Sequence, residues 1–225
     1  MNKTIDKLAT TDRVLAEVQF NNGFDANMEH DGVYTYTNIG PVEEFRDQYV
    51  ALRDRIAVEK LTTPNAAIIA ELEKELASIP TETKWEDALH NLITTVGKNN
   101  ILDNHFTGSA YTATWFVGLI DNASFTALAA ADTMASHAGW IEFVGYSNST
   151  RIAPSWSTAA AGSKAFSTPV SYNINAGGTL NGGFINSVST KSGTTGVLCS
   201  EGSFAATRVV ANGDTLNVSY TSTLT

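Results

Sequence analysis

Charge is nearly absent from the second half of the chain. Residues 106–225 contain five acidic and four basic residues, and the remainder is rich in Ser, Thr, Asn and Gly interspersed with apolar residues. Short alternating segments separated by Gly and Asn turns are typical of antiparallel strands that bury one face and hydrate the other. We therefore expect a β-domain over residues 105–225 that serves as a surface, because it lacks the charged clusters that most catalytic sites use.

Seven strands are expected in this half. The last of them shows the pattern best, because an Asn-Gly turn precedes it and apolar residues alternate with Ser, Thr and Asn along it. No alternation of strands and helices is present between residues 165 and 225, which favours a sandwich or a jelly-roll-like barrel over a parallel sheet. The expected strands are Tyr111–Ile120, Gly139–Tyr146, Ala165–Ile174, Thr179–Ser187, Gly196–Ser200, Ala205–Ala211 and Thr215–Leu224; residues 124–136 fit a short helix or an ordered loop.

The first 40 residues read as an extended arm. After Phe20 and Phe24, an Asp31-Gly32 turn leads into the alternating stretch that contains Tyr34 and Tyr36. This stretch fits a short strand or an arm lying on a neighbouring subunit. The four aromatic residues are expected partner contacts.

Residues 41–104 are predicted to be helical. Phe45, Tyr49, Leu52 and Ile56 recur at spacings of three and four, which places them on one helix face after Pro41. Thr63-Pro64 is expected to cap a second helix that ends before Pro80, so the two form a hairpin. A third helix is expected from about Glu82–Trp85 to Gly97. Expected partner contacts in this segment are Phe45, Tyr49, Leu52, Ile56 and Trp85.

These patterns predict an α+β fold: an N-terminal arm and a helical hairpin, followed by an antiparallel β-sandwich or jelly-roll-like domain. The charge distribution places the boundary, because residues 1–105 hold 18 acidic and 10 basic residues whereas the rest is nearly neutral. The expected divisions are therefore 1–40, 41–104 and 105–225.

The net charge of the chain limits the classes of partner that it can bind. At −9 with a pI near 4.8, the chain lacks the clustered Lys and Arg that bind nucleic acid or anionic membranes. Residues 1–6 are polar and no run of about 18 apolar residues occurs, so we expect a soluble protein made in the cytoplasm. Cys199 is the single cysteine, which excludes an internal disulfide, and its alternating strand predicts a packed thiol.

The sequence offers few candidate catalytic or metal-binding residues. His137 follows Ser136, but no Gly-x-Ser-x-Gly motif surrounds that serine, so a structural histidine is favoured over a general base. His90, Asp103 and His105 lack the paired spacing of metal ligands. We predict no catalytic residue, cofactor or metal.

The four tryptophans divide into two groups. Trp115 and Trp140 lie in apolar segments and are expected in the core. Trp85 and Trp156 are the candidates for sugar-stacking platforms. A host-glycan-binding module would require Trp156 and the loop Ser147–Arg151 to be exposed in a groove.

Several segments of the second half together resemble small structural proteins of tailed bacteriophages, over roughly residues 100–225. They are Ile101–Tyr111, Trp115–Ile120, Ala130–Phe143, Tyr146–Arg151 and Gly213–Tyr220. The resemblance implies a capsid decoration (cement) protein or another virion component with a β-sandwich body, without enzyme activity or cofactor. The implied location is the virion, and the implied partners are the major capsid protein or other virion proteins, with further copies of the chain. The alternatives are a tail, collar or fibre-attachment component, a glycan-binding module, and a hydrolase using His137 or His105.

Overall fold

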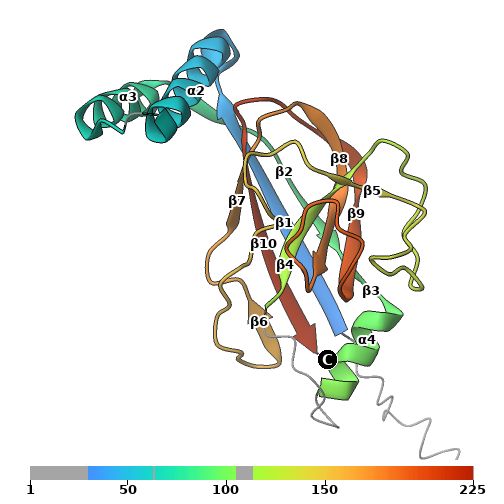
Figure 1. Cartoon of the computed structure of the whole chain (residues 1–225). Coiled ribbons are helices and arrows are strands. Elements are labelled where there is room, and N and C mark those ends of the chain that lie inside the picture. The colour runs from blue at the N-terminus through green and yellow to red at the C-terminus, as the bar shows by residue number, and fades with distance from the viewer. Residues whose placement is uncertain (1–29, 63, 105–113, 225) are drawn as a thin grey trace, which may run out of the picture.

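Two antiparallel sheets form a sandwich-like body from which a helical hairpin projects, so the fold is α+β as predicted (Figure 1). The computed structural model describes residues 30–62, 64–104 and 114–224. None of the helices within these ranges is sufficiently long and apolar to span a membrane.

Each sheet takes strands from distant parts of the chain. The first sheet has the order β2 (Thr81–His90), β1 (His30–Pro41), β10 (Thr215–Leu224), β6 (Ser163–Ala165), with β7 (Val170–Asn173) also paired to β10. The second sheet has the order β3 (Leu92–Ile93), β9 (Leu198–Val210), β8 (Gly178–Asn186), β4 (Phe116–Asp121), β5 (Ile141–Phe143). The helical elements are η1 (Glu43–Phe45), α2 (Arg46–Thr62), α3 (Ala66–Ser78) and α4 (Thr95–Leu102).

Of the two structures expected for the stretch after Asp31, the strand is confirmed, and the arm predicted over residues 1–40 is wrong for the part from residue 30 that the structure describes. This segment is strand β1, which lies in the interior of the first sheet and pairs with β10 over ten residue pairs and with β2 on its other side. Tyr34 and Tyr36 are buried in the core, and the Tyr34 hydroxyl lies 2.7 Å from Ser200 Oγ. They are therefore not partner contacts: their alternation reflects a strand that buries one face. Phe20 and Phe24 lie outside the described residues.

The predicted third helix is also wrong over most of its length. Residues 81–93 form β2 and β3, and helix α4 begins only at Thr95, capped by the Thr94 hydroxyl, which accepts a hydrogen bond from the Gly97 amide. Gly97 therefore lies in the first turn of α4 instead of following a helix end. A β-carbon there would overlap the Cys199 carbonyl, so the glycine permits close packing of α4 on β9.

The boundary expected near residue 105 does not divide the β-body, because β1, β2 and β3 come from the first half of the chain. The hairpin of α2 and α3 was predicted correctly. Its second helix is capped by Asn65, whose side chain accepts hydrogen bonds from the amides of Ala67 and Ile68, whereas the predicted cap Thr63 lies outside the described residues.

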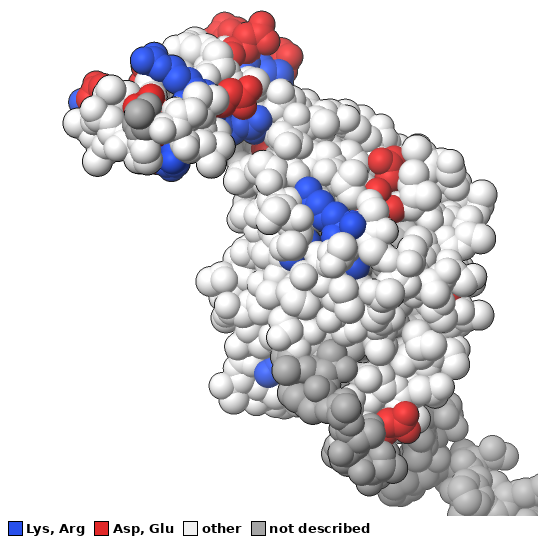
Figure 2. Space-filling model, viewed as in Figure 1, with Lys and Arg blue, Asp and Glu red and all other residues white. Residues whose placement is uncertain are grey.

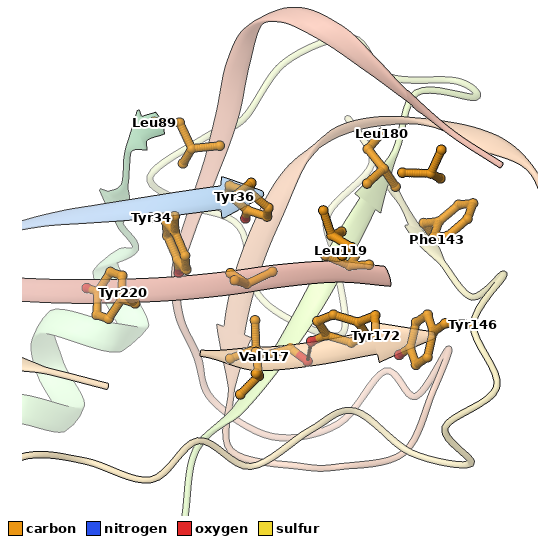
Figure 3. Close-up of a cluster of buried hydrophobic side chains, with 14 of the residues drawn as sticks. Tyr34, Tyr36, Leu89, Val117, Leu119, Phe143, Tyr146, Tyr172, Leu180 and Tyr220 are labelled. Carbon is orange, nitrogen blue, oxygen red and sulfur yellow. Dashed lines mark hydrogen bonds between the residues drawn. The ribbon is translucent and has the colours of Figure 1, made fainter. Parts of the chain in front are cut away.

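The main core lies between the two sheets and is rich in tyrosine (Figure 3). Tyr34 and Tyr36 from β1 and Tyr220 from β10 share it with Tyr172 of β7, whose hydroxyl donates to the Val117 carbonyl at 2.7 Å. Burial raises the pKa of Tyr34 and Tyr172 well above the ordinary value, which keeps both rings neutral. The hydroxyls of Tyr34 and Tyr172 are thus satisfied, whereas the Tyr36 hydroxyl is buried with no hydrogen-bond partner among the described residues.

A second, smaller cluster covers the other face of the second sheet. It joins Trp140 and Met134, from the segment between β4 and β5, to Ile120, Phe184 and Leu198 of the sheet. This segment contains turns and isolated bridges but no helix, so of the two structures expected for residues 124–136 it is the ordered loop. The loop covers one face of β8 and the main core covers the other, so β8 is buried on both sides.

Candidate functional site

The helical hairpin has an apolar core of its own. Leu52 and Ile56 of α2 are buried against Leu72 and Ile79, and Phe45, Tyr49 and Leu76 pack around them. Leu52 and Ile56 were predicted to contact a partner, and this is wrong, because α3 already covers them. Phe45 and Tyr49 are half-buried on the same cluster.

Two arginines fasten α2 to one turn of the β-body. Arg46 Nη1 donates to Asp214 Oδ1 at 3.0 Å and to the Asn212 carbonyl at 2.8 Å. Arg53 donates to the Ile174 carbonyl at 2.8 Å and to Asn212 Oδ1 at 2.6 Å. Charge-assisted hydrogen bonds of this kind are directional, so they set the angle at which the hairpin leaves the body.

Three apolar side chains are exposed at the distal end of the hairpin, and we call this group the hairpin tip. Val58 is 57% exposed and Leu61 85% exposed in the last turns of α2, and Ile68 is 41% exposed in the first turn of α3. The chain enters and leaves the hairpin at the body, where the Val42 amide donates to the Pro80 carbonyl at 3.0 Å. The tip therefore lies at the end farthest from the body (Figure 1).

Charged residues share the hairpin with the apolar tip. Lys60 and Glu73 form an exposed ion pair of 2.7 Å between the two helices. Figure 2 shows acidic and basic side chains gathered on the hairpin, whereas the visible face of the body is mostly uncharged. An apolar group rimmed by charges is the usual composition of a protein-binding surface.

Trp85 joins two strands of the β-body. Its indole N–H donates to the Val209 carbonyl at 2.6 Å, and its ring lies edge-on to Phe204 with 6.0 Å between centroids. Beside it, Asp87 pairs with Arg208 at 2.6 Å. These side chains join β2 to β9 where the two sheets meet, so the prediction of Trp85 as a partner contact is not supported by its position.

The loop proposed for glycan binding is held from within. Arg151 is buried and makes a two-pronged ion pair with Glu142, at 3.0 Å to Oε1 and 2.8 Å to Oε2. It also donates to the carbonyls of Val188 and Gly193, and thereby ties two loops together. Trp156 is half-buried, edge-on to Phe166 at 4.9 Å.

His137 has a structural environment. Its ring stacks on Trp140 with 3.9 Å between centroids, and its Nδ1 lies 3.0 Å from the Trp140 carbonyl. His90 lies 3.2 Å from Asp31 at the surface, and His105 falls outside the described residues. Over the described ranges, no three or more His, Cys, Asp and Glu side chains are grouped so that they could hold a metal ion.

One buried carboxyl has unusual electrostatics. Glu201 of β9 is 0% exposed and accepts hydrogen bonds from Trp140 Nε1 at 2.9 Å and from the Ala129 amide at 3.1 Å. The same amide lies 3.2 Å from Asp132 Oδ2, so the two carboxyl groups meet there. Burial, and then the charge of Asp132, raise the pKa of Glu201 to about 8. Glu201 is thus protonated at neutral pH and fixes the loop onto the second sheet.

Cys199 also agrees with its prediction. It packs against the main core, and burial raises the pKa of its thiol to about 12. The neutral thiol is a poor nucleophile.

Comparison with protein-family models and with curated proteins found no match to this chain.

Proposed function

We propose that this protein is a non-enzymatic structural component of a bacteriophage virion, a capsid decoration protein that binds the outside of the head shell and stabilises it. The observation that carries the proposal is the projecting hairpin with three exposed apolar side chains at its end. The resemblance of the second half to phage structural proteins supports it independently.

The hairpin suits attachment for an energetic reason. Among the residues that the structure describes, Leu61 is the most exposed large apolar residue, and burying one such side chain in a partner's pocket stabilises a complex by about 1.5–3 kcal/mol. Val58 and Ile68 beside it enlarge the buried area. A contact of this size is weak alone, but it becomes strong when several copies bind a repeating lattice, because later contacts form at high effective concentration.

The body suits a passive load-bearing role. Its core extends through both sheets, and the buried Arg151–Glu142 pair and Glu201 hold the long loops against the strands. The partner that we propose is the major capsid protein or another virion protein. The acidic net charge of −9 supports protein rather than nucleic acid as the surface that is bound.

The test is electron cryo-microscopy of particles from the source of this chain, assembled with the wild-type protein or with Leu61→Asp. We expect density for the wild type at repeated positions over the shell, with the hairpin tip against the capsid, and loss of that density for Leu61→Asp. The matched control is Val209→Asp, which places the same charge at an exposed apolar position of β9.

Density confined to the tail or a vertex would indicate a collar or fibre-attachment role instead of capsid decoration. Absence of density would refute a virion role. Deleting residues 1–40 is not a usable test of attachment, since it removes β1 from the interior of the first sheet.

A further inference from the structure

The first sheet has an outer face that carries no charge along the middle of its two central strands; Asp31, which pairs with His90, lies at one end of β1. Side chains alternate along β1 and β10, and those pointing away from the core are half-buried or exposed. The register places them in rows, with Thr35 opposite Ser219 near the middle. The set, which we call the outer face, is Val33, Thr35, Thr37 and Ile39 of β1 with Thr215, Asn217, Ser219 and Thr221 of β10.

The flanking strands extend this face with small polar residues. Ser171 and Asn173 of β7 continue two of the rows, and Ser171 Oγ donates to Asn217 Oδ1 at 2.5 Å. Ala88 of β2 lies beside Thr35, the charged Glu86 beside Thr37, and His90 beside Val33. In the described part of the chain, α2 and α3 pack on each other and α4 packs on β9, while α2 also contacts β1.

We infer that the outer face is the surface through which two copies of this chain associate. Electrostatics favour a second copy as the occupant. Two molecules that each carry −9 repel one another, and the repulsion is smallest where the facing surfaces carry no charge. A basic partner would instead select an acidic face.

Hydrogen-bonding chemistry also favours a second copy of this chain as the molecule that binds the outer face. Hydroxyl and amide side chains both donate and accept, so a face built from Thr, Ser and Asn is complementary to itself. A two-fold contact requires this property, because each residue meets the same patch on the other copy.

The size of the face is sufficient. β1 and β10 pair over ten residue pairs, β2 adds a strand of similar length on one side, and β7 adds four residues on the other. At about 3.4 Å per residue and about 4.8 Å between strands, the face measures about 500 Å² per copy. A pair of copies would bury about 1,000 Å², which is the smallest area expected of a specific interface.

The experiment is sedimentation velocity of the full chain at tens of micromolar. We expect the wild type to sediment as a dimer, and Thr35→Arg to sediment as a monomer because two guanidinium groups would be forced together at the centre of the contact. Thr221→Arg, exposed on β10, provides a second variant on the same face if Thr35→Arg fails to fold, as judged by circular dichroism. The control is Thr207→Arg, exposed on β9.

A monomeric wild type would overturn the inference. So would a dimer that persists in a folded outer-face variant, or one that Thr207→Arg disrupts equally. The measurement uses the isolated chain, so its failure would leave the proposal of capsid binding unaffected.

Discussion

Replacing Glu201 by Gln should remove most of the pH dependence of folding stability between pH 5 and pH 8. Glutamine keeps the shape of the side chain. Its amide oxygen can still accept from Trp140 Nε1, and its NH₂ group can donate to Asp132. The Ala129 amide loses Glu201 Oε1 as an acceptor but keeps Asp132 Oδ2. What changes is that position 201 no longer exchanges a proton.

The sign and size of this pH dependence follow from the linkage between proton binding and folding. The pKa of Glu201 rises from 4.5 to about 8 on folding, so between these values the folded protein holds a proton that the unfolded chain releases. The stability contribution is complete below pH 4.5 and is lost progressively as the pH rises to 8. A shift of this size corresponds to at most about 5 kcal/mol over the whole window, of which about 3 kcal/mol is already lost at pH 7.

The assay is urea unfolding of the wild type and Glu201→Gln at pH values from 5 to 9. We expect the free energy of unfolding of the wild type, relative to Glu201→Gln, to fall by several kcal/mol across this range. Glu86→Gln is the control, because Glu86 is exposed on β2 and should shift the curve little at any pH. Parallel curves for the wild type and Glu201→Gln would refute the reasoning.

Three further predictions address the other polar features. Arg151→Ala leaves the Glu142 carboxylate buried without its partner and should lower the free energy of unfolding by about 3–5 kcal/mol; a loss under 1 kcal/mol would contradict this. Arg46→Ala combined with Arg53→Ala should speed hydrogen exchange in α2 while β10 stays protected, and unchanged exchange in α2 would show that the arginines do not fasten the hairpin. Cys199 should be alkylated slowly at pH 8 in the folded protein and rapidly in urea, whereas equal rates would contradict a buried thiol with a pKa near 12.

Elements with strong local signals were predictable from the sequence. Strand β10 has the predicted bounds, because an Asn-Gly turn fixes its start and alternation runs along its length. Strand β8 is within one residue of its prediction. Two expected strands, Gly196–Ser200 and Ala205–Ala211, overlap the single strand β9, since Gly202 between them is accommodated within the strand.

The first half was harder for a physical reason. Trp85 and Leu89 are four residues apart, and a separation of four keeps two side chains on one face of a helix and also on one face of a strand. Pairing of β2 with β1 decides between them, and the pairing depends on β10, more than 120 residues away in the sequence. No local pattern contains that information.

The candidate site was missed for a related reason. The stripe that includes Leu52 and Ile56 correctly predicts the apolar face of α2, but α3 covers that face, so it is unavailable to a partner. Val58 and Leu61 lie off the stripe and are exposed. The sequence signal that could have identified this site is an apolar residue that lies outside the predicted buried face of a helix.

The hairpin and the outer face are mechanically connected through one residue. Asp214, in the turn before β10, is buried and accepts hydrogen bonds from Arg46 of α2 and from Asn38 of β1, at 3.0 and 2.8 Å. The hairpin is therefore oriented by β1 and β10, the two strands that carry the outer face. In a dimer formed through that face, the two hairpin tips are held in a fixed relation to one another. Attachment of one tip then places the second near its own site, which raises the affinity for a repeating lattice without any additional contact surface.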